Sequence, residues 1–434
     1  MLRRIAILIA AGLFTCQVGQ AAAQRPTVSE KLTIEQAVTI ALANNPRVRE
    51  AREEVAVARA RVGLSKSHYY PQVSFNGIGK LGLSGATNGL GLLGLPASPF
   101  WRNLADAGNV NLDIFDFGRT RHSTAAARAE VDAEQQSFYQ ARIEVAEKAK
   151  TAFLKVLRAQ KTTQVTEQDV RERQAVERRS REFYEVGLSS KLDLDLAQVG
   201  LKNAALALAQ TRDDEQAAWA ELYAALGVPE GTPYNLIEPQ IGLSPPESLE
   251  KELAQALATR PDLKALQAQV EAQQERVEYA RSLRHPFLRG VFSGGYARFA
   301  TLTPAELMAG GLGLFAPIYT GGALKAQVEA EQANLQALQA RYQSASLAAR
   351  NEVSLAHAEL RKALDSAQAS QHIAAYAEEA LRLAQTRYQA QLVSFVDLLT
   401  AETAAESARA NYAQALYDYQ IAMAQLNAAT GFGP

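Results

Sequence analysis

VGLSSKLDL, Val186 to Leu194, interrupts a long run of residues with helical spacing, which resumes after it. A similar stretch, AQLVSFVDL, Ala390 to Leu398, lies 204 residues further along the chain. Each stretch holds a serine followed three positions later by an aspartate, a pattern typical of a helix N-terminus. The two stretches therefore predict equivalent turns, each between a long helix and a returning helix.

The distribution of proline permits very long helices. Proline is absent between Pro99 and Pro229, and again between Pro317 and Pro434. Glycine is also rare in these regions, and from 323 to 430 it does not occur. Because proline and glycine disfavour helix interiors, we expect four helices here. The expected ranges are about 119–186, 190–227, 321–389 and 394–430.

Apolar residues in these ranges recur at steps of three and four, which indicates coiled-coil packing. One such stripe consists of Ile143, Ala146, Ala149, Phe153 and Val156. A helix from about 119 to 184 would be roughly 100 Å long. That length suits a tube or a spacer and not a compact domain.

The chain is internally duplicated. Pro46 in NNPRV matches Pro261 in TRPDL at an offset of 215, while Tyr184 matches Tyr388 at an offset of 204. Repeats of this kind fix the architecture. We expect each unit to run helix, two strands, long helix, turn, helix. The expected organisation is a first repeat at 24–227, a proline-rich connector at 228–249 and a second repeat at 250–434.

Between the helices the sequence alternates between polar and apolar residues, as in NVNLDIF, Asn109 to Phe115. We expect strands at about 71–84, 107–118, 286–298 and 308–319. Such strands fit either an outer-membrane barrel or a small soluble sheet. Aromatic residues near the strand ends suit an interfacial girdle: Tyr69, Tyr70, Phe115, Phe117 and Tyr319. Since four strands cannot close a barrel, the barrel interpretation requires several chains, and a trimer would supply twelve strands.

Residues 1–23 are typical of a signal peptide, with Arg3 and Arg4 before a short apolar core and an A-x-A cleavage site at Ala21 to Ala23. A membrane anchor is the alternative interpretation. The single cysteine, Cys16, lies in this segment and could be a lipid attachment site or an ordinary signal-peptide residue. We therefore expect an exported protein.

Several classes of function find no support. A net charge of −1 does not indicate the basic surface that nucleic-acid-binding proteins carry. The histidines have no metal-ligand spacing, and no catalytic motif is present, so we expect no enzyme, cofactor or metal. GLGLLG, Gly89 to Gly94, matches a dinucleotide pattern, but the prolines after it exclude the helix that such a site needs. The charged residues of the helices are interpreted as solvated faces.

Taken together, these features resemble the TolC-type outer-membrane efflux family over nearly the whole mature chain. The resemblance rests on LTIEQAVTIALANNPRV (Leu32 to Val48), YYPQVSF (Tyr69 to Phe75), IFDFGRTR (Ile114 to Arg121), IYTGGALKAQVEAEQANL (Ile318 to Leu335) and the two turns. The order, duplication and spacing of these motifs make it specific.

The resemblance implies a mixed α and β fold in a homotrimer. Each chain would give four strands to a twelve-stranded transmembrane β-barrel in the outer membrane of a Gram-negative bacterium. The long coiled-coil helices would form a periplasmic α-barrel. The implied function is the outer-membrane channel of a tripartite export system for small toxic compounds or proteins. Its partners would be a periplasmic adaptor, an inner-membrane transporter and outer-membrane lipid. The alternatives are the outer component of type I protein secretion and a periplasmic coiled-coil adaptor or scaffold without a pore.

The resemblance also implies roles for the turns. The first would dock the adaptor through Val186, Gly187, Leu188 and Ser189, and the second through Gln391, Leu392 and Val393. The second turn lacks the glycine of the first, which leaves open whether it closes as tightly.

A periplasmic gate is implied for Tyr388, Asp397 and Asp193. Val393 and Thr400 replace an arginine and an aspartate of the family pattern, so we expect fewer ionic contacts at the gate. In a trimer, three copies of Asp397 around one axis would raise one another's pKa and attract cations. The other interpretation, that the two aspartates are helix caps, is compatible with it.

Overall fold

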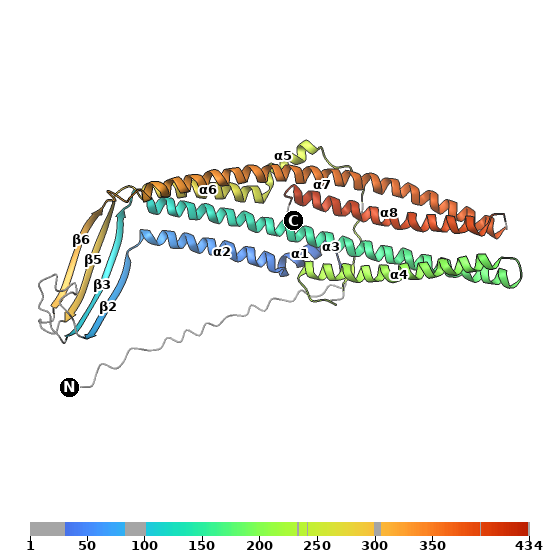
Figure 1. Cartoon of the computed structure of the whole chain (residues 1–434), viewed down its shortest axis with the longest axis horizontal. Coiled ribbons are helices and arrows are strands. Elements are labelled where there is room, and N and C mark those ends of the chain that lie inside the picture. Colours follow the sequence, from blue (N-terminus) through green and yellow to red (C-terminus); the bar gives the residue numbers. More distant parts are fainter. Residues whose placement is uncertain are drawn as a thin grey trace, which may run out of the picture.

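The computed structural model describes residues 31–82, 101–231, 234–240, 242–298, 305–390 and 392–432. The expected signal peptide at 1–23, which includes Cys16, and the stretch Gly89 to Gly94 lie outside these residues. The described part of the chain is elongated. A four-stranded sheet lies at one end and two helical turns lie at the other (Figure 1).

The first repeat comprises β1, α1, α2, β2, β3, α3 and α4. These elements span Lys31–Leu32, Ile34–Asn44, Pro46–Lys66, Gln72–Gly82, Trp101–Phe115, Arg119–Glu185 and Lys191–Leu226. A short 3-10 helix, Ser67–Tyr69, leads from α2 into β2. The connector contains β4, Asn235–Leu236, which pairs in parallel with β1.

The second repeat comprises α5, α6, β5, β6, α7 and α8. These elements span Leu249–Thr259, Pro261–Ser282, Phe287–Arg298, Ala305–Phe315, Ala323–Gln389 and Phe395–Ala429. Both α3 and α7 have 67 residues. The two long helices therefore begin and end at matching positions of the duplicated sequence.

The sequence predicted one helix before the strands of each repeat. The structure has two there, α1 and α2 in the first repeat and α5 and α6 in the second. Pro46 and Pro261 occupy the first positions of α2 and α6. A proline suits this position because its missing N–H would have no helical partner there. Asn45 caps α2 by accepting a hydrogen bond from the backbone N–H of Arg47.

The sheet has the order β2-β3-β5-β6, with every neighbouring pair antiparallel. The central pair, β3 and β5, joins the first repeat to the second. β3 starts and ends earlier than the expected range of about 107–118. Its end is set by Asp116, whose carboxylate accepts hydrogen bonds from the N–H groups of Gly118 and Thr120. These bonds start α3 directly after the strand.

The core lies midway along the molecule in two equivalent places. In the first repeat, α1, α3 and α4 bury Phe153, Leu222 and Leu226. In the second, α5, α7 and α8 bury Val353 and Leu360. The predicted stripe from Ile143 to Val156 is buried throughout. Each large apolar side chain that is fully buried contributes about 1.5–3 kcal/mol to folding.

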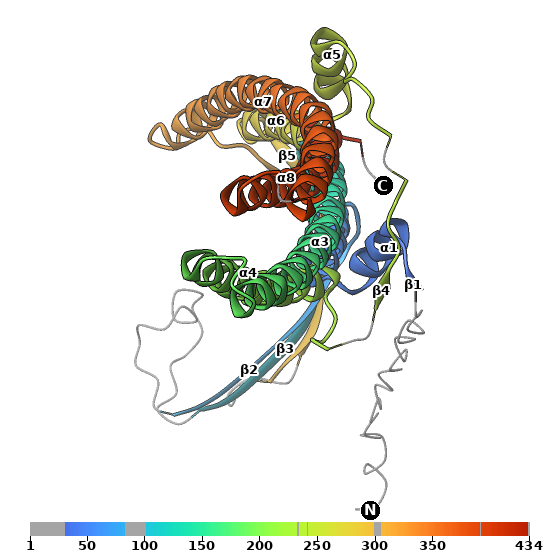
Figure 2. The ribbon, with the colours of Figure 1, turned by 90° about the vertical axis from the view of Figure 1, so that its right-hand side faces the viewer.

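Seen along its long axis, the helical part is a curved layer that is open on one side (Figure 2). α4 lies towards one end of the curve and α7 towards the other, while α3 and α8 meet between them. Among the described helices, none combines the length and the apolar composition needed to cross a membrane.

Candidate functional site: the two helical turns

The two turns lie side by side at the end of the molecule opposite the sheet (Figure 1). The first joins α3 to α4, and the second joins α7 to α8. Each pair of helices with its turn is here called a hairpin: the first hairpin is α3 and α4, and the second is α7 and α8. Every described residue predicted for docking or gating falls in one of these two turns or in the adjoining helical ends.

The first turn closes α3 with a glycine in the left-handed conformation. Gly187 has φ +78°, which residues with a side chain rarely adopt. Its N–H donates to the carbonyl of Tyr184 at 3.0 Å, and the N–H of Leu188 donates to the carbonyl of Phe183 at 2.8 Å. This pair of bonds is a Schellman motif, which satisfies the free carbonyl groups at the end of α3.

The second turn forms the same outer hydrogen bond without a glycine. The N–H of Leu392 donates to the carbonyl of Arg387 at 2.9 Å, the counterpart of the bond from Leu188. Gln391, which stands where the first turn has Gly187, lies outside the described residues. The two turns are therefore equivalent in this one hydrogen bond.

Both returning helices begin with a complete capping box. In the first, Ser190 and Asp193 each accept a hydrogen bond from the backbone N–H of the other. Ser394 and Asp397 repeat this arrangement in the second. Hydrogen bonds from the side chain and backbone of Ser394 lower the pKa of the Asp397 carboxyl. Both aspartates therefore serve as caps within a single chain.

Tyr388 connects the two hairpins. Its ring lies against Phe395 of α8, with ring centroids 5.9 Å apart. Burial raises the pKa of the Tyr388 hydroxyl, Asp193 raises it further, and Arg179 and the hydrogen bond with Ser180 lower it. Because Asp193, Arg179 and Ser180 belong to the first hairpin, two of the predicted gate residues, Tyr388 and Asp193, lie in one electrostatic environment.

The surface of the turns is apolar. Leu188 is 64% exposed and Leu392 is 74% exposed, and Val186 is also exposed. Ser189 and Val393 are half-buried. Leucine and valine held in water at the end of a molecule are available to a protein partner.

Two groups of residues near the turns were not predicted from the sequence. Leu192 and Val396 are exposed apolar residues in the first turn of each returning helix. Their signal was their matching position in the two repeats. The second group, Arg173 and the acids around it, is buried between the hairpins and corrects the interpretation of all helix charges as solvated.

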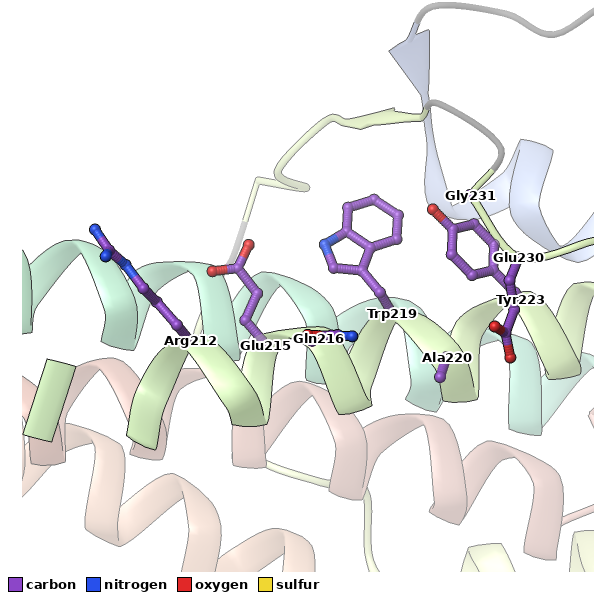
Figure 3. A pocket seen from close by; sticks show the side chains of 8 residues that line it. All are labelled: Arg212, Glu215, Gln216, Trp219, Ala220, Tyr223, Glu230 and Gly231. Carbon is purple, nitrogen blue, oxygen red and sulfur yellow. The ribbon is translucent and has the colours of Figure 1, made fainter. Parts of the chain in front are cut away.

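A pocket of about 410 Å³ lies on α4 away from the turns. Its lining residues are Arg212, Glu215, Gln216, Trp219, Ala220, Tyr223, Glu230 and Gly231 (Figure 3). The rings of Trp219 and Tyr223 stack with centroids 5.6 Å apart. Within the described part of the chain, no group of three or more metal-ligating side chains could hold an ion. The pocket offers a stacked aromatic pair together with the charged side chains of Arg212, Glu215 and Glu230.

Comparison with known proteins places this geometry in a family. The outer membrane efflux protein family matches residues 37–228 and 253–432, one segment for each repeat. Protein CyaE of Bordetella pertussis is 29% identical over 421 residues, covering 93% of this chain and 85% of the relative. Outer membrane efflux protein BepC of Brucella suis is 25% identical over 423 residues, covering 96% of this chain and 88% of the relative.

A solved structure shares the fold. The CmeC outer membrane channel of Campylobacter jejuni superimposes with a TM-score of 0.79 at 18% identity, covering 92% of this chain and 86% of that one. Proteins of the matched family are outer membrane channels and not enzymes, and they form trimers that work with an adaptor and an inner-membrane transporter. The chain therefore belongs to the outer membrane efflux protein family and is the outer-membrane channel of a tripartite export system, with its helices in the periplasm.

Proposed function

We propose that the two turns are the end of the channel that receives its cargo, and that they dock a periplasmic adaptor protein. The observation that carries this proposal is the exposed apolar surface of both turns, formed by Val186, Leu188, Leu192, Leu392 and Val396. Ser189, Gln391 and Val393 complete the docking set by position. Equivalent turns in the two repeats would give an adaptor two similar docking points on each chain.

Tyr388, Asp193 and Asp397 form the proposed gate. Tyr388 belongs to the second hairpin but lies in the electrostatic field of Asp193 in the first. Separation of the hairpins would break this contact. Three copies of Asp397 around an axis would oppose the effect of Ser394 and raise the pKa of each carboxyl. The ring of acids would then favour cations at the entrance.

The unpaired edges of the sheet support assembly with further copies of the chain. β2 and β6 are the outer strands of the described sheet. Each has 11 residues, long enough to pair with another strand along its full length. Three copies joined edge to edge would close twelve strands into the proposed barrel. The curved helical layer of Figure 2 would close into a tube by the same rotation.

The proposed cargo is small toxic compounds, with exported protein as the alternative that the experiment separates. A photoreactive residue placed at Ser189 should, on irradiation of living cells, capture a periplasmic adaptor. An adaptor that serves a drug pump would support small-compound export, whereas one that serves a protein-exporting transporter would change the cargo to protein. The control is the same label at Arg350, which is exposed, lies outside the apolar stripe of α7 and is roughly 60 Å along that helix from the turn.

A double variant, Leu188→Glu with Leu392→Glu, tests the docking surface by function. It should abolish the captured adaptor and sensitise cells to toxic compounds, because two charges would enter the apolar contact. The amount of trimer in the outer membrane should not change. Capture at Arg350 in place of Ser189, or full resistance in the double variant, would show that docking occurs elsewhere.

A further inference from the structure

A group of charged side chains is buried where the two hairpins meet. Arg173 of α3 donates from Nη1 to Oε2 of Glu402 at 3.1 Å and from Nη2 to Oε2 of Glu406 at 3.3 Å, both on α8. Its Nε donates to Oδ1 of Asp169, one turn earlier on α3, at 3.3 Å. The side chain of Arg173 is 7% exposed and that of Glu402 is 3% exposed. We call Asp169, Arg173, Glu402 and Glu406 the Arg173 cluster.

The Arg173 cluster holds more negative than positive charge. One guanidinium serves three carboxylates, and the nearby Arg409 is engaged by Glu172 and Glu378. Oε1 of Glu402 is buried and has no hydrogen-bond partner among the described residues. A buried, ionised carboxylate with an unpaired oxygen is costly. Taking up a proton removes most of this cost, so the site favours a protonated acid.

The groups that face Glu402 come from every neighbouring helix. α3 contributes Asp169, Glu172 and Arg173, α7 contributes Tyr388, and α8 contributes Glu406. On α4, Gly200 lies against Arg173 and leaves space for its side chain. Burial raises the pKa of Glu402 to about 7, Asp169 and Glu172 act in the same direction, and Arg173 opposes them. Burial also raises the pKa values of Asp169 and Glu406.

The duplication provides an internal comparison. At the offset of 204, Asp169 and Arg173 correspond to Ile373 and Ala377 on α7, and Glu402 and Glu406 correspond to Gln198 and Lys202 on α4. These positions lie on the helices towards the two ends of the curved layer in Figure 2. The charge set is therefore present at one of the two equivalent positions only. The duplicated helices therefore form without it at the second position, and apolar residues of similar size could hold helices together at least as firmly.

We propose that the Arg173 cluster is a proton-binding joint, which holds α8 against α3 when Glu402 carries a proton and loosens when that proton is lost. The ligand of the site is the proton itself. The inference rests on the contact between the hairpins and not on the identity of the adaptor or the cargo. It can therefore fail while the proposed docking surface stands.

The direction of the pH effect follows from the raised pKa of Glu402. Below its ordinary value of 4.5, Glu402 is protonated whether the hairpins are joined or apart. Between 4.5 and about 7 only the joined state binds the proton, so the joint weakens as pH rises through this range. Above about 7 the weakening is complete. The contribution of Glu402 is therefore greatest below about pH 4.5 and is lost progressively from there to about pH 7.

Cysteine accessibility measures how often the joint opens. Ala405 is fully buried, one turn after Glu402, and Gln368 is an exposed residue of α7 outside its apolar stripe. The alkylation rate of Ala405→Cys is measured from pH 5 to 8 in the full-length trimer in detergent. It is divided by the rate of Gln368→Cys, in which Ala405 is retained. Each pKa unit of difference between the joined and open states should raise this ratio about tenfold. Comparison with the same cysteine in a Glu402→Gln background removes the pH dependence of the thiol itself.

The expected result is a ratio that rises at least tenfold with pH when Glu402 is present and less than twofold when it is glutamine. Glu379→Gln, which removes an exposed acid paired with Arg382 on α7, should leave the rise intact. Identical profiles with Glu402 and with glutamine, or a ratio that falls with pH, would overturn the proposal.

Infrared difference spectroscopy provides a test that needs no cysteine. The wild-type trimer should lose the C=O stretch of a protonated carboxyl group between pH 5 and 8, centred near pH 7, and Glu402→Gln should lack that band. If the two proteins give the same difference spectrum, Glu402 does not bind a proton in this range and the joint has another role.

Discussion

At the scale of single residues, a glycine follows the ends of α3, α4 and α8. Gly187 and Gly227 both have positive φ, at +78° and +67°. Their surroundings differ. A Cβ on Gly187 would meet nothing within 4 Å, whereas a Cβ on Gly227 would lie 3.1 Å from the backbone carbon and oxygen of Asn44. Gly431, the counterpart of Gly227 in the second repeat, has an equally close contact with Arg260.

The two glycines should therefore respond differently to alanine. Gly187→Ala should cost about 1–2 kcal/mol of stability, the penalty for the left-handed conformation alone. Gly227→Ala should cost more, because the turn between α1 and α2 must also move. Thermal unfolding of the two variants, followed by circular dichroism, measures the difference. Equal losses would show that the contact with Asn44 relaxes freely.

At the scale of elements, the two repeats have equivalent long helices that carry different charged residues at matching positions. α3 packs against α8 through the Arg173 cluster, and Arg409 adds a second link through Glu172 of α3 and Glu378 of α7. Hydrogen bonding to Glu378 raises the pKa of Arg409, so this guanidinium stays charged. Ion pairs therefore hold the hairpins together near the turns, and Arg158 of α3 adds another with Asp418 of α8 farther along, beside the apolar core.

Removal of Arg173 should be far more costly than removal of an exposed arginine. Arg173→Ala leaves the buried Asp169 and Glu402 and the half-buried Glu406 without their counter-charge, which should cost about 3–5 kcal/mol. Arg382→Ala is the matched control, since Arg382 forms an exposed pair with Glu379 on α7 and should change the unfolding temperature little. Acidic conditions should restore part of the loss in Arg173→Ala, because protons would replace the missing charge. A similar unfolding temperature for both variants would mean that the carboxylates already carry protons at neutral pH.

At the scale of the whole molecule, an apolar face of α7 lies uncovered towards one end of the curved helical layer. α7 exposes an apolar stripe that includes Leu347, Leu355, Ile373 and Tyr376. A stripe of this kind is normally covered by another protein surface. Family members form trimers, and α7 lies towards one end of the layer in Figure 2, so the next chain is the expected cover.

A charge in this stripe should prevent assembly without unfolding the chain. Ile373 is 57% exposed in the single chain, so Ile373→Glu should fold but fail to form trimers. Native mass measurement of the protein extracted in detergent reports the oligomer. Glu359→Lys is the control, because it changes an exposed charge on α7 without adding one to the stripe. A normal trimer from Ile373→Glu would place the contact between chains on another face.

The sequence by itself determined the length of the helices, the position of both turns, the duplication and the strands. These features depend on local chemistry: proline and glycine end or exclude helices, serine and aspartate start them, and alternation sets a strand. The resemblance in sequence also supplied most residues of the proposed docking surface, and the structure added Leu192 and Val396. The division of the first expected helix at Pro46 was missed, although proline at a helix start is a local signal.

Only the tertiary structure decided which charges are buried and how the second turn closes. Asp169 and Arg173 have the same spacing as an ordinary solvated pair on a helix, and nothing in their own segment distinguishes them. Glu402 and Glu406, which bury that pair, are more than 200 residues away along the chain. Burial is a property of two surfaces that meet, and a local pattern describes only one of them. The contact that makes Glu402 sensitive to pH therefore arises when the two repeats fold against each other.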